Sequence, residues 1–323
     1  MENDLYKDRW FAIVNPVAGS GRGLKDWPQI CDVLYQSNIK FDALFTLHKY
    51  HAIELAVQAV NKGYRQIIVI GGDGTLHEVV NGLFIQTKVE PKDVLIAVVA
   101  VGTGNDWIRM FGIPKTYPEA IKAICDKHTF LQDVGKVDYW ECRVKHTRYL
   151  ANVAGCGYDA MVCNMFNNYH SKGYRGKWLY IFAAFAQAFT YKTKDTTIIA
   201  DGKQIFNGKM FTGTIGVCKY TAGGLSQTPL AIPDDGLFDL TIVPKVKSRF
   251  LLFLKYWKSL FNDKIYDVPG VKLVRGSTLE IKSNPSIRVE LDGEIMGESD
   301  LKFEIIEKAI RVVVSEKFIY ANV

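Results

Sequence analysis

The sequence predicts two domains, an N-terminal three-layer α/β domain with a parallel sheet and a C-terminal antiparallel β-sandwich domain. The chain has 323 residues, about twice the usual length of a single domain. In the first 130 residues, short β-branched or aromatic runs alternate with helical stretches, which indicates a parallel sheet covered by helices on both faces. From about Thr129 onward, strand-like segments separated by turn dipeptides dominate, which favours antiparallel pairing.

The strands expected in the first domain are apolar along their whole length, as strands buried on both faces are. They are Phe11–Val14, Phe41–Phe45, Gln66–Ile70 and Val94–Val99. The helical stretches between and after them are Leu24–Ser37, Ala52–Asn61 and Leu76–Phe84. We therefore place a nucleotide-binding α/β domain at residues 1–130.

The second half is divided by dipeptides that are typical of tight hairpin turns. They are Asp201-Gly202, Asn207-Gly208, Asp235-Gly236 and Asp292-Gly293. Two helical insertions are expected, around Tyr158–Tyr191 and Arg249–Phe261. We place a β-rich domain at residues 131–305, and the sequence leaves open whether residues 306–323 return to the first domain.

The composition is that of an ordinary globular protein, with 48% hydrophobic and 23% charged residues. The net charge of +6 fits either a solvated surface or attraction to an anionic partner, and by itself it favours the solvated surface. Six cysteines occur without a CxxC pair or a Cys/His cluster at metal-binding spacing. We therefore expect reduced thiols that serve mostly in packing.

The sequence carries no recognisable targeting or membrane-spanning segment. Its first ten residues, MENDLYKDRW, are polar and acidic, where a signal peptide would be basic and then apolar. The longest apolar run, Trp178–Ala186, is too short to span a bilayer. The prediction is a cytoplasmic protein whose membrane contact, if it has any, is peripheral and at the inner face.

Three glycine-rich segments each follow a predicted strand of the first domain, namely Asn15–Gly21, Gly71–Thr75 and Gly102–Asp106. Ligands of open parallel sheets bind outside the carboxyl ends of the strands, where these segments lie. Glycines let the backbone approach a phosphate closely, and N–H groups with a helix N-terminus supply the positive field. Thr75 and Thr103 add hydroxyl donors. Asp73 and Asp106 would repel phosphate, so their presence indicates Mg²⁺ between them and the ligand.

The standard mononucleotide and dinucleotide patterns do not explain these loops. GxxxxGK[ST] is absent, which excludes a P-loop enzyme. One GxGxxA pattern occurs at Gly155–Ala160, after the predicted strand Tyr149–Ala154, and invites a dinucleotide-binding interpretation. No acidic residue ends a following strand there, and the pattern lies in the antiparallel half. We therefore favour a tight strand-to-helix turn.

The motifs of the chain together resemble the diacylglycerol kinase catalytic family, which includes bacterial lipid kinases and sphingosine kinases. The resemblance rests on GGDGTLHEVVNGL at Gly71–Leu83, preceded by NPVAGSG and followed by GTGNDWIR at Gly102–Arg109. It continues through AGCGYDA, the AGG segment, PDDGLFDL at Pro233–Leu240 and LDGE at Leu291–Glu294. Ala18 stands where the family often has Ser, and Ala100 where a Pro usually precedes GTGND.

The resemblance implies roles for individual residues. Positions that match ATP-binding residues are Asn15, Thr46, Gly71, Gly72, Asp73, Gly74, Thr75 and Thr103. Asp73 matches an aspartate close to the Mg²⁺–triphosphate. Glu294 matches the carboxylate that accepts the proton of the lipid hydroxyl, with Asp292 beside it. Asp235, with the carbonyls of Ile232 and Leu237, matches a second Mg²⁺ site of structural character. From the residues alone, Asp292-Gly293 predicts a type I′ turn.

Two segments combine basic flanks with an apolar aromatic core, as interfacial helices do. Lys172–Lys194 carries five Lys or Arg residues around WLYIFAAFAQAF, and Lys245–Lys264 carries six around FLLFLKYW. The alternative is that both helices pack on the β domain while lysines cover their edges. The six histidines are dispersed, and none is assigned a role.

The sequence thus predicts an ATP- and Mg²⁺-dependent lipid kinase, with ATP bound by the first domain, the acceptor by the second and the active site in the cleft between them. A kinase for a soluble acceptor such as NAD is one alternative, and a nucleotide-binding regulator without catalysis is another. No nucleic-acid motif is present, so no nucleic-acid partner is expected. The identity of the lipid and the formation of a homo-oligomer stay open.

Overall fold

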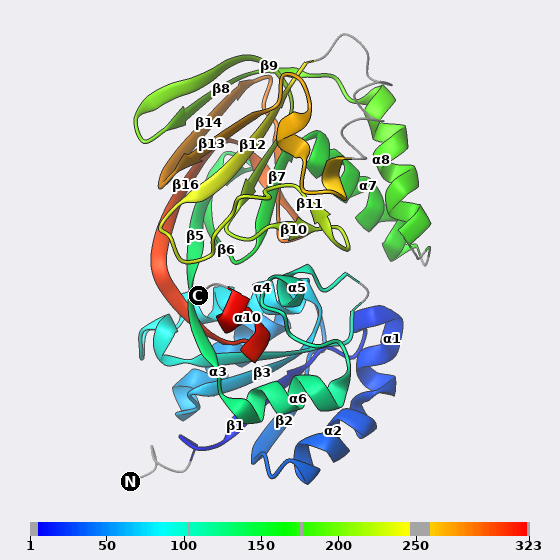
Figure 1. Cartoon of the computed structure of the whole chain (residues 1–323), viewed down its shortest axis with the longest axis vertical. Helices are drawn as coiled ribbons and strands as arrows, with labels where there is room; N and C mark the ends of the chain where they lie inside the picture. Colours follow the sequence, from blue (N-terminus) through cyan, green and yellow to red (C-terminus); the bar gives the residue numbers. More distant parts are fainter. Residues whose placement is uncertain (1–5, 103, 173, 175–176, 246–258, 322–323) are drawn as a thin grey trace. The chain divides into compact units, whose positions relative to one another are not determined.

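The computed structural model describes residues 6–321, apart from 103, 173, 175–176 and 246–258. The chain forms two compact units (Figure 1). Unit 1 comprises Met1–Val134 with Glu307–Val323, and unit 2 comprises Gly135–Ile306. Two strands, β5 (Thr129–Glu141) and β16 (Glu294–Val313), belong partly to each unit. Within the described residues, no helix has the length and apolar character needed to cross a membrane.

Unit 1 is built on a sheet whose strands pair in parallel. Its order is β16, β4, β3, β1 and β2. The strands of this unit are β1 (Trp10–Val14), β2 (Phe41–Phe45), β3 (Gln66–Gly71) and β4 (Leu95–Ala100). The C-terminal part of β16 joins them through the pair Val312 and Ile96. Because the pairs Val14–Ile70 and Ile70–Val99 are in register, these strands end at one edge of the sheet.

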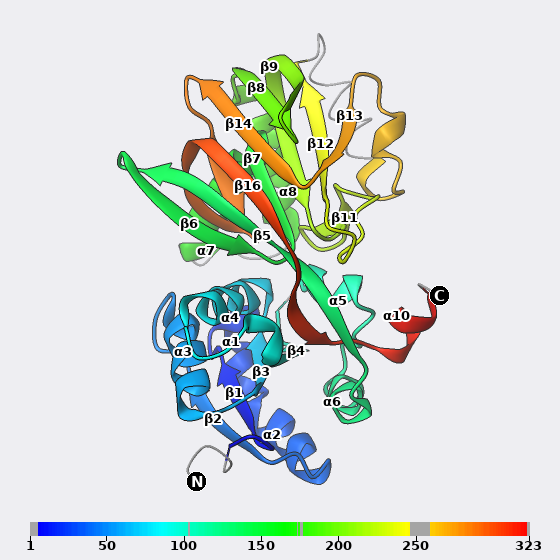
Figure 2. The same cartoon turned by 90° about the vertical axis from the view of Figure 1, so that its left-hand side faces the viewer.

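Helices lie on both sides of this sheet, as Figure 2 shows for α3 and α4 on one side and α6 on the other. The helices are α1 (Ala18–Lys25), α2 (Trp27–Gln36), α3 (His51–Lys62), α4 (Asp73–Ile85), α5 (Asp106–Met110), α6 (Tyr117–Asp126) and α10 (Glu316–Ala321), with a 3-10 turn η2 (Pro91–Asp93). Every residue of β1 is buried, because both faces of the strand are covered. Alternate residues of β1 and β3 pack with Ile30 of α2 and Ile121 of α6.

Unit 2 is rich in antiparallel strands. They are β6 (Val144–Leu150), β7 (Val153–Gly157), β8 (Lys194–Ala200), β9 (Lys203–Gly216), β12 (Phe238–Pro244), β13 (Lys272–Gly276), β14 (Thr278–Asn284) and β15 (Arg288–Leu291), with the short pair β10 (Tyr220–Thr221) and β11 (Leu225–Ser226). The pairing runs from β9 through β7, β15, β16, β14 and β8 back to β9, so the strands close on themselves. A buried apolar cluster that includes Phe238, Phe303 and Ile281 lies among these strands.

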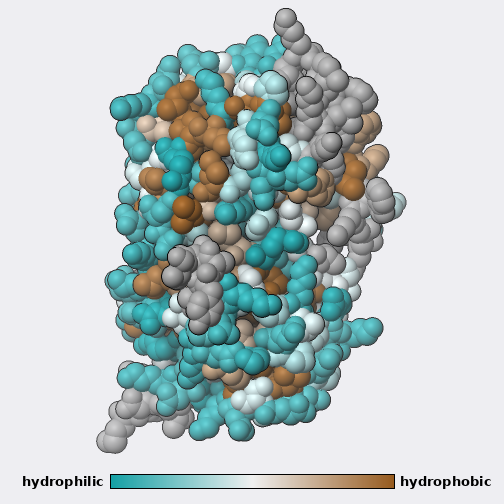
Figure 3. Space-filling model, in the orientation of Figure 1, coloured by the Kyte–Doolittle hydropathy of each residue, from teal (hydrophilic) through white to brown (hydrophobic). Residues whose placement is uncertain are grey.

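The outer surface of this unit also carries apolar residues, which Figure 3 shows over the region of β8 and β14 in the view of Figure 1. The partly buried apolar residues that pack against the core cluster are Ile205, Val274, Met296 and Ile305. They extend the core outward from the closed strands.

Two helices interrupt the strands of unit 2. They are α7 (Tyr158–Ser171) and α8 (Lys177–Thr190), and a 3-10 turn, η3 (Ile265–Asp267), lies further along the chain. The GxGxxA pattern is a strand-to-helix turn, as predicted, because β7 ends at Gly157 with φ 78° and α7 begins at the next residue. The predicted helix Arg249–Phe261 falls largely on residues 246–258, outside the described residues, as does most of Lys245–Lys264.

The turn dipeptides have unequal outcomes. Asp201-Gly202 joins β8 to β9 and Asp292-Gly293 joins β15 to β16, and all four residues have positive φ, as a type I′ turn requires. The prediction of a turn at Asn207-Gly208 is wrong, because both residues lie inside β9 and Asn207 pairs with Thr197 of β8. Continuous pairing with a neighbouring strand overrides the local preference of the dipeptide. Asp235-Gly236 lies in the loop before β12.

Candidate functional site

The three glycine-rich loops of unit 1 meet at the edge where β1, β3 and β4 end. Asn15 after β1 donates through Nδ2 to Oγ1 of Thr75 in α4, at 2.9 Å. A Cβ on Gly19 would lie 1.9 Å from the carbonyl oxygen of Val101, so the first and third loops approach backbone to backbone. A Cβ on Gly102 would lie 3.4 Å from Cα of Gly72 and 2.6 Å from Oδ1 of Asn105. The glycines therefore permit a packing of loops that side chains would prevent.

Helix α4 directs its N-terminus into this loop cluster. Its N-cap is Gly72, whose extended backbone carries no side chain to bond the first N–H groups. Glycine is required at position 71, because a Cβ there would lie 2.4 Å from Oγ1 of Thr75. With Gly74 in its first turn, the helix has no side-chain cap hydrogen bond at its N-terminus, where the positive end of its dipole lies. This arrangement favours binding of an anion such as a phosphate group.

Asp73, the first residue of α4, connects the second loop to the third by hydrogen bonds. Its Oδ2 accepts the N–H of Asp106 at 3.0 Å, and its Oδ1 accepts the N–H of Trp107 at 3.1 Å. Asp73 thus caps the N-terminus of α5 from a different helix. Trp107 is fully buried and donates through Nε1 to Gln132 at 2.9 Å, which anchors α5 in the unit.

The oxygen atoms around Asp73 suit a hard divalent cation. The carboxylate oxygens of Asp73, which accept the N–H groups of Asp106 and Trp107, are hard donors of the type that Mg²⁺ binds. Oδ1 of Asn105 is buried and has no hydrogen-bond partner among the described residues, while its Nδ2 donates to the carbonyl of Gly102. Mg²⁺ takes oxygen ligands of this kind and keeps waters of its own. Asp73 and Asn105 therefore fit Mg²⁺.

Of the other predicted ATP-binding residues, Thr46 lies at the same edge. Thr46 follows β2, is 8% exposed, and donates its backbone N–H to Val14 at 2.8 Å. Thr103 lies outside the described residues. Sequence reasoning missed Glu78 of α4, whose carboxylate accepts the N–H groups of Tyr50 and Ala52, both at 3.0 Å, at the start of α3. No local motif signals this role, because the two partners are more than twenty residues away.

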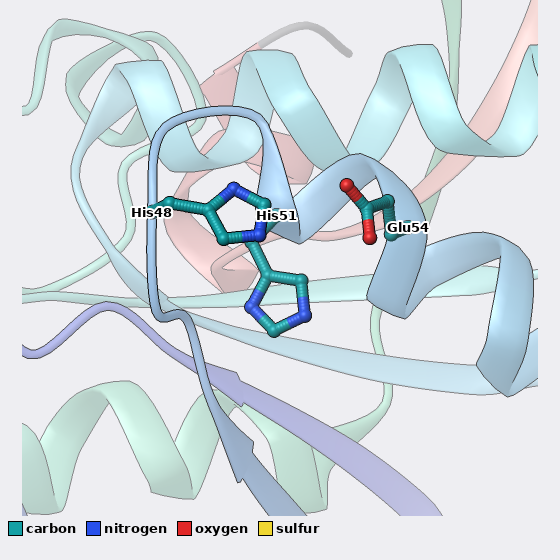
Figure 4. A group of neighbouring side chains, drawn as sticks. All are labelled: His48, His51 and Glu54. Atoms are coloured by element: carbon teal, nitrogen blue, oxygen red, sulfur yellow. The ribbon is translucent and has the colours of Figure 1, made fainter.

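Figure 4 shows His48 and His51 near the start of α3, with Glu54 further along that helix. Their potential ligand atoms all lie within 4.8 Å of one another. Nδ1 of His51 accepts the N–H of Leu47 at 3.0 Å, so the ring proton is on Nε2 and neither nitrogen has a free lone pair. His48 places Nδ1 2.9 Å from the carbonyl of Lys49 and retains only Nε2. In this arrangement the cluster lacks the three protein ligands that zinc sites use.

In unit 2, the Asp292-Gly293 turn is fixed by its own aspartate. The carboxylate of Asp292 accepts three backbone N–H groups, those of Ala151 at 3.1 Å, Asn152 at 2.9 Å and Val153 at 3.1 Å. Asp292 therefore joins the β15–β16 turn to the start of β7. Glu294, the first residue of β16, follows directly and is half-buried. Glu294 thus follows a turn that hydrogen bonds to a neighbouring strand hold in place.

Two buried carboxyl groups of unit 2, Asp159 and Glu290, were missed by sequence reasoning. Burial raises the pKa of Asp159 to about 6, although Thr214 and Gln227 donate hydrogen bonds to its Oδ2. Burial also raises the pKa of Glu290 well above its usual value, and the charge of Asp159 adds to this shift. Oε2 of Glu290 accepts the N–H of Gly293 at 2.8 Å. Glu290 directly precedes the LDGE motif, which is the only sequence signal that could have identified it.

Asp235 forms an ion pair with Arg275. Its Oδ1 accepts the N–H of Leu237 at 3.2 Å, and its Oδ2 pairs with Nη2 of Arg275 on β13. Nε of Arg275 also contacts Asp239 at 3.2 Å. A cation bound to Asp235 and the carbonyls of Ile232 and Leu237 would therefore compete with Arg275 for the same carboxylate. The metal at Asp235 stays a prediction.

Comparison with known proteins covers nearly the whole chain. Residues 9–137 match the family model of the diacylglycerol kinase catalytic domain, and residues 152–314 match the YegS C-terminal NAD kinase beta sandwich-like domain. A protein of Bacillus subtilis that is provisionally named as a lipid kinase, YtlR, is 28% identical over 315 residues, with 94% of this chain and 98% of that protein covered. A diacylglycerol kinase of Staphylococcus haemolyticus is 28% identical over 304 residues, with 93% and 86% covered.

Two solved structures are similar in fold. A diacylglycerol kinase structure from Bacillus anthracis superimposes with a TM-score of 0.72 at 21% identity and covers 96% of this chain and 98% of that chain. Yeast NADH kinase has a TM-score of 0.58 at 13% identity and covers 97% and 85%. At these identities the similarity establishes the fold, an N-terminal α/β domain and a C-terminal β-rich domain.

Proposed function

The chain belongs to the diacylglycerol kinase catalytic family of ATP-dependent lipid kinases, and we propose that it transfers the γ-phosphoryl group of ATP to the hydroxyl of a diacylglycerol-like or sphingoid-like lipid. The observation that carries the proposal is the meeting of three glycine-rich loops at the N-terminus of α4, braced by Asp73. A site of this kind holds phosphate groups by backbone donors and excludes bulky side chains.

Unit 1 supplies the phosphoryl donor. The N–H groups at the start of α4 bind phosphate oxygens, and Asn15 and Thr75 fix the position of the first loop against the second. Asp73 and Asn105 would hold Mg²⁺, which neutralises charge on the phosphates during transfer. The two hydrogen bonds from the N-terminus of α5 hold the carboxylate of Asp73 in one orientation. This carboxylate is therefore oriented before ATP binds.

Unit 2 supplies the acceptor side of the reaction. Glu294 accepts the proton as the O–H bond of the lipid hydroxyl breaks, a new O–P bond forms, and ADP leaves with the β–γ bridging oxygen. Asp292 serves the turn and not the proton transfer, because its carboxylate accepts three backbone N–H groups. This division of roles separates two carboxylates that the LDGE motif places two residues apart.

We further propose that α8 contacts the lipid surface that holds the acceptor. Phe182, Phe185 and Phe189 recur at helical spacing on one face of α8 and are 53%, 47% and 44% exposed. The opposite face, which includes Ala184 and Ala188, is buried with residues of α7. Aromatic side chains on one face of a surface helix insert into the headgroup region of a bilayer. The basic Lys172 before α8 is exposed and suits an anionic membrane.

The proposal is tested by transfer of labelled γ-phosphate from Mg-ATP to hydroxyl lipids in mixed micelles, with NAD as a soluble acceptor. We expect labelled lipid, and about a thousandfold lower turnover in Glu294→Gln, because loss of a general base costs this order of rate. Glu304→Gln, an exposed position on the same strand β16, is the matched control. Label only in NAD would overturn the lipid proposal, and full activity of Glu294→Gln would remove Glu294 from its role.

The membrane contact has a separate test. The triple variant Phe182→Ser, Phe185→Ser and Phe189→Ser should sediment with anionic vesicles at least about tenfold more weakly than wild type, since it loses apolar area that enters the membrane. Tyr35→Ser in unit 1, where Tyr35 is 65% exposed, controls for a general change of surface polarity. Equal sedimentation of wild type and the triple variant would exclude α8 as the contact.

A further inference from the structure

The peptide group between Gly293 and Glu294 is held by two side chains of helix α7. Sγ of Cys163 donates to the carbonyl oxygen of Gly293 at 3.0 Å, and Nδ2 of Asn167 donates to the same oxygen at 3.0 Å. Cys163 and Asn167 are four residues apart, so they lie on one face of α7. A contact of 3.5 Å from Nδ2 of Asn167 to Sγ of Cys163 joins the two donors.

This peptide group determines where Glu294 points. Because the peptide bond is planar, the carbonyl oxygen of Gly293 and the N–H and Cα of Glu294 move together. Gly293 has a φ of 87°, and a Cβ at this position would meet no atom within 4 Å. The residue is therefore not restrained by packing. Its conformation is instead set by the pairing of Leu291 with Glu294 across the turn and by hydrogen bonds from side chains. The N–H of Gly293 is held by Glu290, and its carbonyl is held by α7.

Cys163 is kept in the form that can donate. Burial raises the pKa of its thiol well above the usual value, and the charges of Glu290 and Glu294 add to the shift. The thiol therefore stays protonated at neutral pH. A thiol is a weak donor, so the amide of Asn167 supplies the stronger of the two hydrogen bonds.

The same helix packs against α8. Tyr158 and Val162 of α7 share a buried cluster with Ala183, Ala184 and Ala188 of α8, and the hydroxyl of Tyr158 donates to the carbonyl of Ala184 at 2.7 Å. The residues that hold the peptide before Glu294 are thus on a helix whose neighbour exposes three phenylalanines.

We infer that Asn167 is a positioning residue for the phosphoryl transfer, because its amide, supported by Cys163, fixes the peptide that carries Glu294 and links the Asp292–Glu294 turn to the α7–α8 helix pair. The inference rests on the proposed function, in which Glu294 accepts the proton of the lipid hydroxyl. It assigns a role in the reaction to α7, a helix that lies outside the three glycine-rich loops.

Steady-state kinetics of Asn167→Ala test this role, with Asn207→Ala as the matched control. Asn207 is exposed on β9 and has one weak contact, at 3.5 Å, with Thr197. We expect Asn167→Ala to lower kcat for lipid phosphorylation about tenfold, since a misplaced base slows proton transfer, and to leave KM for ATP within about twofold of wild type. Asn207→Ala should leave both constants unchanged.

A second pair of variants separates positioning from packing. Cys163→Ser keeps a hydroxyl donor toward Gly293 and should retain most of kcat, whereas Cys163→Ala should lose part of it. Hydrogen exchange of the peptide spanning residues 291–295 should be faster in Asn167→Ala than in Asn207→Ala, because the turn loses a restraint.

The outcomes distinguish the inference from the function on which it rests. A wild-type enzyme that phosphorylates lipid, together with an Asn167→Ala variant of unchanged kcat, overturns the inference and leaves the proposed function intact. A fall in kcat that is matched by an equal fall in the fraction of folded protein also overturns it, because the role is then structural. A wild-type protein that labels no lipid overturns the proposed function first, and the inference with it.

Discussion

The loop cluster of unit 1 and the Asp292-Gly293 turn of unit 2 both depend on glycine, yet they are held in different ways. In the loop cluster, backbone approaches backbone, and a Cβ on Gly19 would lie 1.9 Å from the carbonyl oxygen of Val101. At the turn, a Cβ on Gly293 would meet nothing within 4 Å, and the backbone is instead held by side chains of Asp292, Glu290 and Asn167. Glycine permits close approach and positive φ in the first region, and positive φ alone in the second.

The difference follows from the role that we propose for each region. A phosphate cradle needs many N–H groups close together, and glycine is the residue that lets main chains pack so tightly. A turn that presents one carboxylate needs a fixed direction, which hydrogen bonds from neighbouring elements supply. The first site is therefore sensitive to added atoms, and the second to lost hydrogen bonds.

The largest effect should come from Asp73→Asn. Asparagine keeps one accepting oxygen for the N-terminus of α5 and replaces the other by a donor, and it loses the charge that suits Mg²⁺. We expect kcat/KM for Mg-ATP to fall about a thousandfold, since preorganised electrostatic groups contribute at this scale. Asp93→Asn, at an exposed position of the same unit, is the control, and an Asp73→Asn enzyme of normal activity would contradict the assignment.

Alanine substitutions test whether glycine is needed for close approach in one region and for positive φ in the other. Gly19→Ala should lower the free energy of unfolding by about 3 kcal/mol, because Cβ meets a carbonyl oxygen and φ is +58°. Gly293→Ala and Gly21→Ala have positive φ but open space, so each should cost about 1 kcal/mol. Urea unfolding of the three variants measures the difference. Equal losses at Gly19 and Gly21 would show that close approach does not matter in the first loop.

The buried Asp159 should make the stability of unit 2 depend on pH. Its pKa of about 6 in the fold lies above its ordinary value of 3.8, so the folded protein binds more protons between these values. Its contribution to stability is therefore complete below about pH 4 and is lost as the pH rises through about 6, a change of about 3 kcal/mol. Asp159→Asn removes this titration.

This prediction is measured by unfolding wild type and Asp159→Asn across the pH range. The stability of the variant relative to wild type should increase from pH 4 to pH 7, since only wild type must bury a charge at the higher pH. Asp195→Asn, at an exposed ion pair with Lys209, is the control for removal of a surface carboxylate. A constant difference between wild type and Asp159→Asn would exclude a raised pKa.

The smallest effect is expected at Arg275, which pairs with Asp235 and Asp239 at a partly exposed position. Arg275→Gln should lower the free energy of unfolding by about 1 kcal/mol, because the guanidinium is partly exposed and glutamine keeps an N–H donor for the buried Asp239. If the guanidinium competes with a cation, added Mg²⁺ should raise the melting temperature of Arg275→Gln more than that of wild type. Equal responses to Mg²⁺ would contradict competition at Asp235.

The contiguous parts of the molecule were accessible from the sequence. The strand–glycine–helix segments follow from local pattern, and the in-register strands of unit 1 bring the three loops to one edge. The type I′ turn at Asp292-Gly293 is confirmed, because both residues have the positive φ that the dipeptide favours. The turn predicted at Asn207-Gly208 is wrong, because pairing between β8 and β9 overrides a local preference.

The glycine-rich loops, the turn at Asp292-Gly293 and the family motifs can be identified from the sequence, because each depends on neighbours a few positions apart. The groups that hold these motifs in place are evident only in the folded molecule. Glu78 caps α3 from α4, Asp292 binds the start of β7, and Asn167 of α7 reaches the turn before Glu294. These contacts join residues up to 140 positions apart, so no local pattern contains them. They exist because the fold brings separate elements within hydrogen-bond distance, and burial makes each such bond necessary.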